Sequence, residues 1–434
     1  MSHDTIELLS QYLHIDTTNP PGNEKRGVAF FARIFEEEGI AYKTYEPSAG
    51  RSSIKAVIPG TGEKGAIILL NHIDVVPAKA DEWSVHPFGG EVKDGFIYGR
   101  GALDMKSLGI MEMLAFLEVK RQGLTPCRDL IFLAVADEEA GGRQGVQYLL
   151  DQYPDDFQAD LVLNEGGFGL NNVLTNRPLF MFATSEKGVC QIRLTSSGPP
   201  GHGSTPHGNN ALEKLVQALN RVLSGDNPII VTPQIAEYFK QLGTEWDFLK
   251  PYLKDGNTAT LIDALTGSGM INIPQISAML RNTISLNILK SGDKTNVIPS
   301  KAQAELDIRL LPGTEPDAFI AEVKKRLADE NIRIEPLKKS SASKSPMDTD
   351  DFATIKSVHM AHYPNALTVA SLLFGASDSR FFRDKGIPCY GVCPMLASLE
   401  EFNRVHGIDE RVSVDSMLEG TQVYTDMVKK LCRV

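Results

Sequence analysis

The stretch AIILLNHIDVVP, residues 66–77, decides the fold, because a buried-strand pattern runs straight into two side chains suited to metal binding. Ala66 to Leu70 form a short, continuous apolar run, which is typical of a strand covered on both faces. His72 and Asp74 follow this run. Side chains two residues apart on an extended segment share a face, so we predict that the Asp74 carboxylate accepts the His72 ring N–H.

Other acidic groups also follow predicted strands. Apolar runs at 130–136 and 161–163 predict strands, the first leading to the pair Glu138 and Glu139 and the second to Glu165. In open α/β sheets, ligands bind beyond the carboxyl ends of the strands. We therefore predict that these carboxylates meet the imidazole of the first stretch at one edge of the sheet.

Two more groups can join this edge. Asp104 lies just before a helix predicted over 106–122, and His406 lies in a loop after a strand predicted over 388–393. The predicted metal ligands are His72, Asp104, Glu139, Glu165 and His406. Such a set suits divalent ions, chiefly zinc, and one carboxylate can bridge two ions about 3.5–4 Å apart, as in aminopeptidase-like hydrolases. Glu138 is then free to act as a general base on the attacking water.

The rest of the chain indicates two domains, because 434 residues are too many for one ordinary core. Strands alternating with helices indicate an α/β domain with a mostly parallel central sheet. Around residue 187 the pattern changes to that of a smaller α+β domain with an antiparallel sheet. We predict a catalytic domain in two parts, 1–186 and 339–434, interrupted by a lid domain at 187–338.

The predicted lid has an irregular middle. Its predicted strands are 188–196, 283–289 and 302–310, and its predicted helices are 210–223 and 315–327. This order of elements is typical of a small α+β unit. Between them, residues 227–280 are polar and poorly periodic, so only weak helices are expected there.

At these residues the sequence resembles the dizinc hydrolase family of aminoacylase, acetylornithine deacetylase, succinyldiaminopimelate desuccinylase and carboxypeptidase G. The matching stretches span nearly the whole chain in the family's order: NHIDVVP, GRGALDMK, ADEEAGG, LNEGG, GHGSTP, NVIP, DIRLLPG, GASDSRFF and the late His406. The resemblance implies an aminopeptidase-like catalytic domain and a ferredoxin-like lid through which two identical subunits pair. It also implies two zinc ions per subunit, for which cobalt or manganese could substitute.

The resemblance assigns a role to each residue of the metal site. It makes Glu138 the general base and Asp74 the residue that orients an imidazole, and the bond from Asp104 to Met105 is often cis in this family. One zinc would be held by His72 and Glu165, the other by Glu139 and His406, with Asp104 bridging both.

The lid has implied roles as well. His202 would reach into the partner subunit's active site and stabilise the oxyanion of the reaction, as a preorganised donor does. Arg309 and Asn296 resemble lid residues that bind the substrate's carboxylate, which suits an arginine fork. The substrate would also contact the backbone of a short loop, formed by Gly375, Ala376 and Ser377.

The predicted reaction is hydrolysis of the amide bond of an N-acyl amino acid or a short peptide with a free carboxylate. Aminoacylase or deacylase activity and carboxypeptidase or dipeptidase activity both stay open. A non-catalytic carboxylate-binding relative would lack ligands or base, and all are present here. A nucleotide-binding oxidoreductase would need a strand–GxGxxG–helix context, which the glycine clusters at 60–65 and 99–101 do not have.

The bulk composition fits a small-molecule enzyme. The formal net charge of -11 disfavours nucleic acid and anionic membranes as partners, since both attract basic surfaces. Five cysteines, an odd number at scattered positions, disfavour a disulfide framework. The amphipathic N-terminus does not resemble a signal peptide, and no long apolar segment predicts a membrane span. We therefore expect a cytoplasmic protein.

Overall fold

The computed structural model describes residues 2–171 and 175–434 of the chain. Eleven strands of the described chain form one large sheet, in the order β1-β2-β6-β3-β7-β18-β9-β8-β19, with β16 and β17 also paired to β9. The strands of this central sheet are β1 (Tyr42–Ser48), β2 (Arg51–Ile58), β3 (Ile67–His72), β6 (Leu130–Val135), β7 (Leu161–Asn164), β8 (Phe168–Leu170), β9 (Leu179–Glu186), β16 (Ser343–Lys344), β17 (Leu367–Leu373), β18 (Cys389–Gly391) and β19 (Leu396–Ala397).

The middle of the central sheet is parallel, as predicted. Strands β6, β3, β7 and β18 run in the same direction, and every residue of β3, β6 and β7 is buried. Alternate side chains of β3 and β6 enter two separate cores, one with the helices on each face. One face is covered by α1 (Ser2–Leu13), α2 (Lys25–Glu37), α3 (Lys106–Arg121), α11 (Asp350–His362) and α14 (Val414–Cys432), and the other by α4 (Val146–Gln152) and α12 (Ser379–Arg383). This burial on both faces explains the continuous apolar runs.

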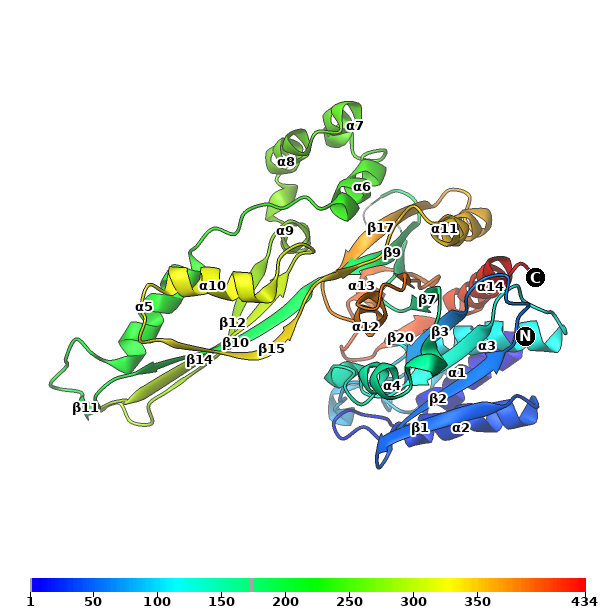
Figure 1. Cartoon of the computed structure of the whole chain (residues 1–434), viewed down its shortest axis with the longest axis horizontal. Coiled ribbons are helices and arrows are strands. Elements are labelled where there is room, and N and C mark those ends of the chain that lie inside the picture. Colours follow the sequence, from blue (N-terminus) through cyan, green and yellow to red (C-terminus); the bar gives the residue numbers. More distant parts are fainter. Residues whose placement is uncertain (1, 172–174) are drawn as a thin grey trace.

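A second sheet, here called the lid sheet, has the antiparallel order β12-β14-β10-β15. Its strands are β10 (Gly188–Ser197), β12 (Thr283–Ser291), β14 (Lys301–Leu310) and β15 (Arg333–Ser340), and its helices are α5 (Ala211–Leu223) and α10 (Pro316–Leu327). Both helices pack on one face of this sheet, around a separate apolar core. Figure 1 shows the lid sheet extending away from the central sheet.

Residues 227–280 are more ordered than their polar sequence predicts. They form α6 (Pro233–Leu242), α7 (Lys250–Asp255), α8 (Thr258–Gly267) and α9 (Pro274–Leu280), which gather above the junction of the two sheets in Figure 1. Their apolar side chains share a core with Val369 and Leu372 of β17. The helices therefore cover a strand of the central sheet.

Two small sheets complete the described chain. β11 (Gly201–His202) pairs with β13 (Val297–Ile298) at the far end of the lid sheet (Figure 1), and we call this pair the lid tip. β4 (Val92–Lys93), β5 (Phe96–Tyr98) and β20 (Arg411–Ser413) form the other. None of the helices in the described part of the chain combines the length and the apolar character that crossing a membrane requires.

The predicted domain boundaries lie at or near the ends of these strands. The limit after 186 falls between β9 and β10, where the chain passes from the central sheet to the lid sheet. The limit after 338 falls inside β15, which continues to Ser340 before β16 returns to the central sheet. We keep the division into an interrupted catalytic domain and a lid as a proposal.

Candidate metal centre

Two imidazoles face one carboxylate at the carboxyl end of the parallel strands. The His72 Nε2 atom, at the end of β3, lies 2.9 Å from Oδ1 of Asp104. The His406 Nε2 atom lies 3.0 Å from Oδ2 of the same carboxylate, although His406 follows Asp104 by 302 residues. Asp104 thus offers one oxygen to each imidazole, the geometry that a ligand bridging two ions requires. The peptide bond to Met105 is cis, as the resemblance implies.

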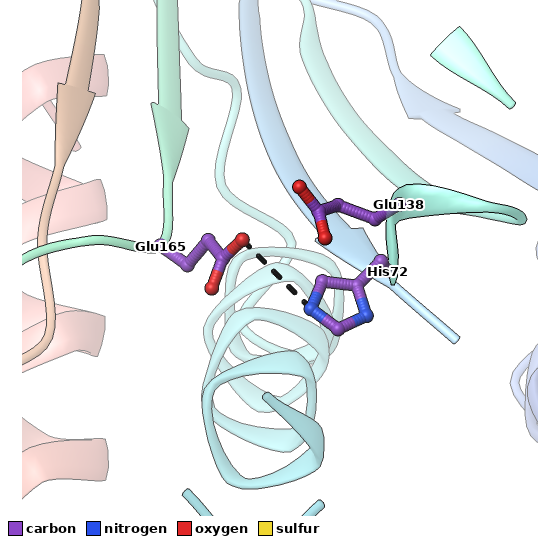
Figure 2. Close-up of side chains that lie close together, drawn as sticks. All are labelled: His72, Glu138 and Glu165. Carbon is purple, nitrogen blue, oxygen red and sulfur yellow. Dashed lines mark ion pairs between the residues drawn. The ribbon is translucent and has the colours of Figure 1, made fainter. Parts of the chain in front are cut away.

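Each imidazole has a second carboxylate beside it. Oε1 of Glu165, which directly follows β7, lies 3.8 Å from Nε2 of His72. Oε1 of Glu139 lies 3.4 Å from Nε2 of His406. Figure 2 shows Glu165 and Glu138 approaching the His72 ring from separate chain segments. Among the described residues, two sets of side chains have ligand atoms within 4.8 Å of one another: His72, Glu138 and Glu165, and His72, Asp104 and Glu139.

These donors fit divalent metal ions. Burial, followed by the charge of Asp104, raises the pKa of Glu165 well above its usual value. Burial, followed by the charge of Glu165, does the same for the pKa of Glu138. The Oε1 atom of Glu139 is buried without a hydrogen-bond partner. A cation would relieve both the crowding of carboxylates and the unsatisfied oxygen, and histidine with carboxylate ligands suits zinc.

A buried ion pair that sequence reasoning missed ties the Asp104 segment to the His406 loop. Arg100 Nη1 donates to Glu410 Oε2 at 2.6 Å, and both side chains are buried. Glu410 Oε1 accepts the backbone N–H of Asp104 at 3.1 Å, while Arg100 Nη2 donates to the carbonyl of Gly407 at 3.0 Å. This pair, the Arg100–Glu410 clamp, holds together two loops that each carry a predicted metal ligand.

Asp74 contacts His72 through a different atom from the one predicted. The ring N–H at Nδ1 of His72 donates to the backbone carbonyl of Asp74 at 2.8 Å, and the carboxylate lies 3.7 Å away. The extended segment ends at His72, so the face-sharing argument does not reach residue 74. The carboxylate instead accepts the backbone N–H groups of Glu138 and Glu139, each at 3.1 Å, and the Asn19 amide at 2.8 Å. Asp74 therefore positions the predicted base as well as an imidazole.

Behind this turn lies a second buried network that the motifs did not predict. Arg51 Nη2 contacts Glu24 at 2.9 Å and Asp137 at 2.5 Å, and Arg51 Nη1 donates to Asn19 at 3.2 Å. Burial, followed by the charge of Asp74, raises the pKa of Glu24 to about 7. Asp137 has a φ of +73° and immediately precedes Glu138, so the network fixes the backbone from which the predicted base projects.

His202 and Asn296 lie together at the lid tip, away from the metal ligands. His202 pairs with Val297 across β11 and β13, and the N–H of Gly203 donates to the carbonyl of Asn296 at 2.8 Å. Figure 1 places this tip at the opposite end of the lid sheet from β3 and β7. Neither side chain makes a hydrogen bond or ion pair with a predicted metal ligand within 2–171 and 175–434.

Arg309 lies near the other end of the lid sheet, on β14. Its Nε and Nη2 atoms donate to the two carboxylate oxygens of Asp307 at 2.9 and 3.2 Å. The arginine fork predicted for a substrate carboxylate is thus shared with an aspartate of its own strand.

The loop predicted to contact substrate lies between β17 and α12. Gly375 is exposed, Ala376 is half-buried, and the N–H of buried Ser377 donates to Glu186 at 2.5 Å. The next residue, Asp378, is also buried, and neither of its carboxylate oxygens has a hydrogen-bond partner in the described chain. Burial raises its pKa to about 7. Its place in the stretch GASDSRFF was the signal available in the sequence.

The chain is similar to several known proteins. Residues 68–430 match the sequence profile described as Peptidase family M20/M25/M40. The N-fatty-acyl-amino acid synthase/hydrolase PM20D1 of Xenopus tropicalis is 30% identical over 373 residues, which are 83% of this chain and 72% of that protein. Aminoacylase-1 of Homo sapiens is 29% identical over 444 residues, covering 100% and 96%. The solved M20 family metallo-carboxypeptidase Sso-CP2 of Sulfolobus solfataricus shares the fold, with a TM-score of 0.76, 15% identity and coverage of 99% and 100%.

Proposed function

The chain belongs to peptidase family M20/M25/M40, as its motifs predicted, and from that premise we propose that it hydrolyses the amide bond of N-acyl amino acids or short peptides with a free carboxylate. One observation carries the proposal: Asp104 presents one oxygen to each of two imidazoles, with a further carboxylate beside each imidazole. Family membership makes the chain a metal-dependent hydrolase of peptide or amide bonds. The substrate is the part that we propose.

We assign two zinc ions to this centre, with cobalt or manganese as possible substitutes. Bound there, the ions would polarise the scissile carbonyl and lower the pKa of a water molecule. The residues that would hold them are His72 and Glu165 for one ion, Glu139 and His406 for the other, and Asp104 between them.

Glu138 is the proposed general base. Its carboxylate faces the centre in Figure 2, and its backbone N–H is held by Asp74 at 3.1 Å. From this position the carboxylate would take a proton from the attacking water and then give it to the departing amine, as general acid–base catalysis requires. The Arg51 network fixes the same turn from behind, so the base would need little reorganisation during the reaction.

His202 is proposed to complete the site of a partner subunit. Its Nδ1 atom accepts the backbone N–H of Ser204 at 3.1 Å, so the neutral ring carries its proton on Nε2. That proton can be donated to a developing oxyanion. Because the lid tip lies far from the centre of its own chain (Figure 1), we propose a homodimer in which each lid serves the other subunit.

Arg309 and Asn296, together with the backbone of Gly375, Ala376 and Ser377, are proposed to bind the substrate's free carboxylate and acyl segment. An arginine fork suits a carboxylate, although Arg309 would have to share its donors with Asp307. We also propose a reducing compartment, the cytoplasm, and five buried cysteines in the thiol form support it.

The test is elemental analysis of the purified protein, paired with a panel of N-acyl amino acids and dipeptides assayed before and after chelation. Two zinc per chain and chelator-sensitive cleavage of N-acyl amino acids are expected. Cleavage of dipeptides alone would replace the aminoacylase activity with a carboxypeptidase or dipeptidase activity. If metal-loaded protein cleaves nothing in the panel, the proposed function is wrong.

A further inference from the structure

One face of the lid sheet carries charges, and the other carries the lid core. Paired residues of neighbouring antiparallel strands share a face. Cys190 and Ile308 lie in the core beneath α5 and α10, so their pairing partner Lys339 is on the helix side, where it binds Asp317 at 2.6 Å. The alternate residues therefore occupy the face without helices: Gln191, Asp307, Arg309 and Lys338.

Lys338 on this open face lies beside the turn that carries Glu138, the proposed base. A Cβ atom placed on Gly141 would come within 2.9 Å of Lys338 Nζ, and Gly141 closes the turn that begins at Glu138. The backbone of Lys338 pairs with Gln191, but its half-buried side chain makes neither a hydrogen bond nor an ion pair within the described chain. Burial, followed by the charges of Arg380 and Arg309, lowers its pKa.

The cations around Lys338 are only partly compensated. Arg309 pairs with Asp307. Arg380 donates to the backbone carbonyls of Gly141 and Ser377 and lies 4.0 Å from the carboxylate of Asp378. Arg143 is exposed and, like Lys338, has no hydrogen bond or ion pair with any residue that the structure describes. The charge of Glu138 partly offsets these cations, but Lys338 and Arg143 have no direct partner among the described residues and are free to bind an anionic ligand.

A cavity of about 590 Å³ opens at this cluster, between α4, α12 and the end of β15. Its cations come from β15, from α12 and from the loop before α4, and they are Arg143, Arg380, Lys338 and Lys339. Two acids, Asp151 and Asp384, also line it, and neither forms an ion pair with Lys338 or Arg143 in the described chain. Because Gly141 lines the cavity as well, the wall is shared with the turn that carries Glu138.

We propose that Lys338 and Arg143 form a subsite for a second carboxylate of the substrate, so that the chain prefers N-acyl amino acids with acidic side chains. This inference rests on the proposed function and adds a substrate class to it. The first carboxylate would still be bound by Arg309, together with Asn296 of the partner subunit. The second, on the amino acid side chain, would enter the cavity beside Gly141 and meet the two unpaired cations.

The test compares N-acetyl-glutamate with N-acetyl-glutamine, which differ only in the side-chain carboxylate. Zinc-loaded wild type should cleave the glutamate substrate with a kcat/KM about tenfold higher or more, the size expected of a lost charge-assisted hydrogen bond. Lys338→Met should abolish this preference through KM, while cleavage of the glutamine substrate stays within about threefold. Lys338→Arg should keep the preference.

Lys290→Met is the matched control, because this exposed lysine lies on β12 of the same sheet and does not line the cavity. It should leave the preference unchanged. Equal cleavage of both substrates by wild type, or an equal loss of both in Lys338→Met, overturns the subsite. If N-acetyl-methionine is cleaved while neither test substrate is, the subsite alone fails. If none of the three is cleaved by metal-loaded protein, the proposed function fails with it.

Discussion

The metal centre and the lid tip carry the residues of one proposed reaction, but they are built in opposite ways. At the centre, His72 is buried, Asp74 positions His72 and Glu139, and the Arg100–Glu410 clamp positions Asp104. At the tip, His202 is exposed, and its strand pair is two residues long. The predicted ligands lie together within one chain, whereas His202 lies far from them, which fits the proposal that the lid tip serves another subunit.

The largest effect is expected from a substitution in the proposed metal centre that leaves the lid tip unchanged. Glu138→Gln removes the proposed base but keeps the shape of the side chain, so kcat should fall by about 10³-fold or more. Metal content and thermal stability should stay near wild type, since Glu138 is not a proposed ligand. Steady-state kinetics and elemental analysis test this, with exposed Glu91→Gln as the control. A Glu138→Gln enzyme with near-normal kcat would remove the residue from the mechanism.

The next effect is expected from a substitution at the lid tip that leaves the proposed metal centre unchanged. His202→Ala should lower kcat by about 100-fold, the cost of losing one oxyanion donor, with full metal content. His207→Ala, in the same loop, serves as the control. Mixing and refolding His202→Ala with Glu138→Gln in equal amounts should recover about a quarter of wild-type activity, because half of the dimers are mixed and each has one intact site. Failure to recover any activity would argue that the tip does not serve a partner.

A smaller effect is expected from a substitution that weakens the support of the turn carrying Glu138 and Glu139. Asp74→Asn places an amide where the carboxylate accepts two backbone N–H groups and the Asn19 amide. Loss of such a support costs about 10- to 100-fold in activity or metal affinity. Zinc titration and kcat should both show it. An unchanged kcat with unchanged zinc affinity would mean that the turn is held by the Arg51 network alone.

The last expected effect is on stability, not on activity, and concerns a carboxyl group behind the centre. Glu112, on α3, is fully buried, accepts from Asn71 at 2.8 Å, and burial raises its pKa to about 8. In the folded chain Glu112 therefore retains a proton, which the same side chain releases above about pH 4.5 in the unfolded chain. Stability should fall between pH 5 and 8, by up to about 1.4 kcal/mol per pH unit for one proton.

Glu112→Gln should flatten that slope, because its amide does not titrate. Melting temperatures from pH 5 to 8 measure the effect, and exposed Glu91→Gln should keep the wild-type slope. A slope that is equally steep in Glu112→Gln would place the responsible group elsewhere, with Glu24 as the next to examine.

The two regions also differ in what the sequence could predict. The ends of β3, β6 and β7 were predictable because continuous apolar runs mark strands buried on both faces, and their last residues must meet at one edge. β15 was missed: it is an edge strand with mixed polarity and Pro336 in its middle, a pattern that edge strands tolerate. Because β15 was not predicted, Lys338 could not be placed beside the turn that carries Glu138.

The supporting contacts were the other part that the sequence could not predict. Arg100 and Glu410, or Arg51 and Asp137, meet only after the chain has folded, and nothing in their spacing pairs them. The placement of His202 at the lid tip depends likewise on the pairing of β11 with β13. Motifs therefore predicted the chemistry, and the structure adds how it is held.

The Arg100–Glu410 clamp has a consequence for biosynthesis. His406 and Glu410 leave the ribosome about 300 residues after Asp104, so a nascent chain presents His72, Asp104 and Glu165 long before the remaining imidazole exists. At about 5–20 residues per second, that interval lasts roughly 15–60 s. During it the whole lid is synthesised. The ion held by His406 would consequently be acquired last, and its arrival would mark the passage from an inert nascent chain to a working enzyme.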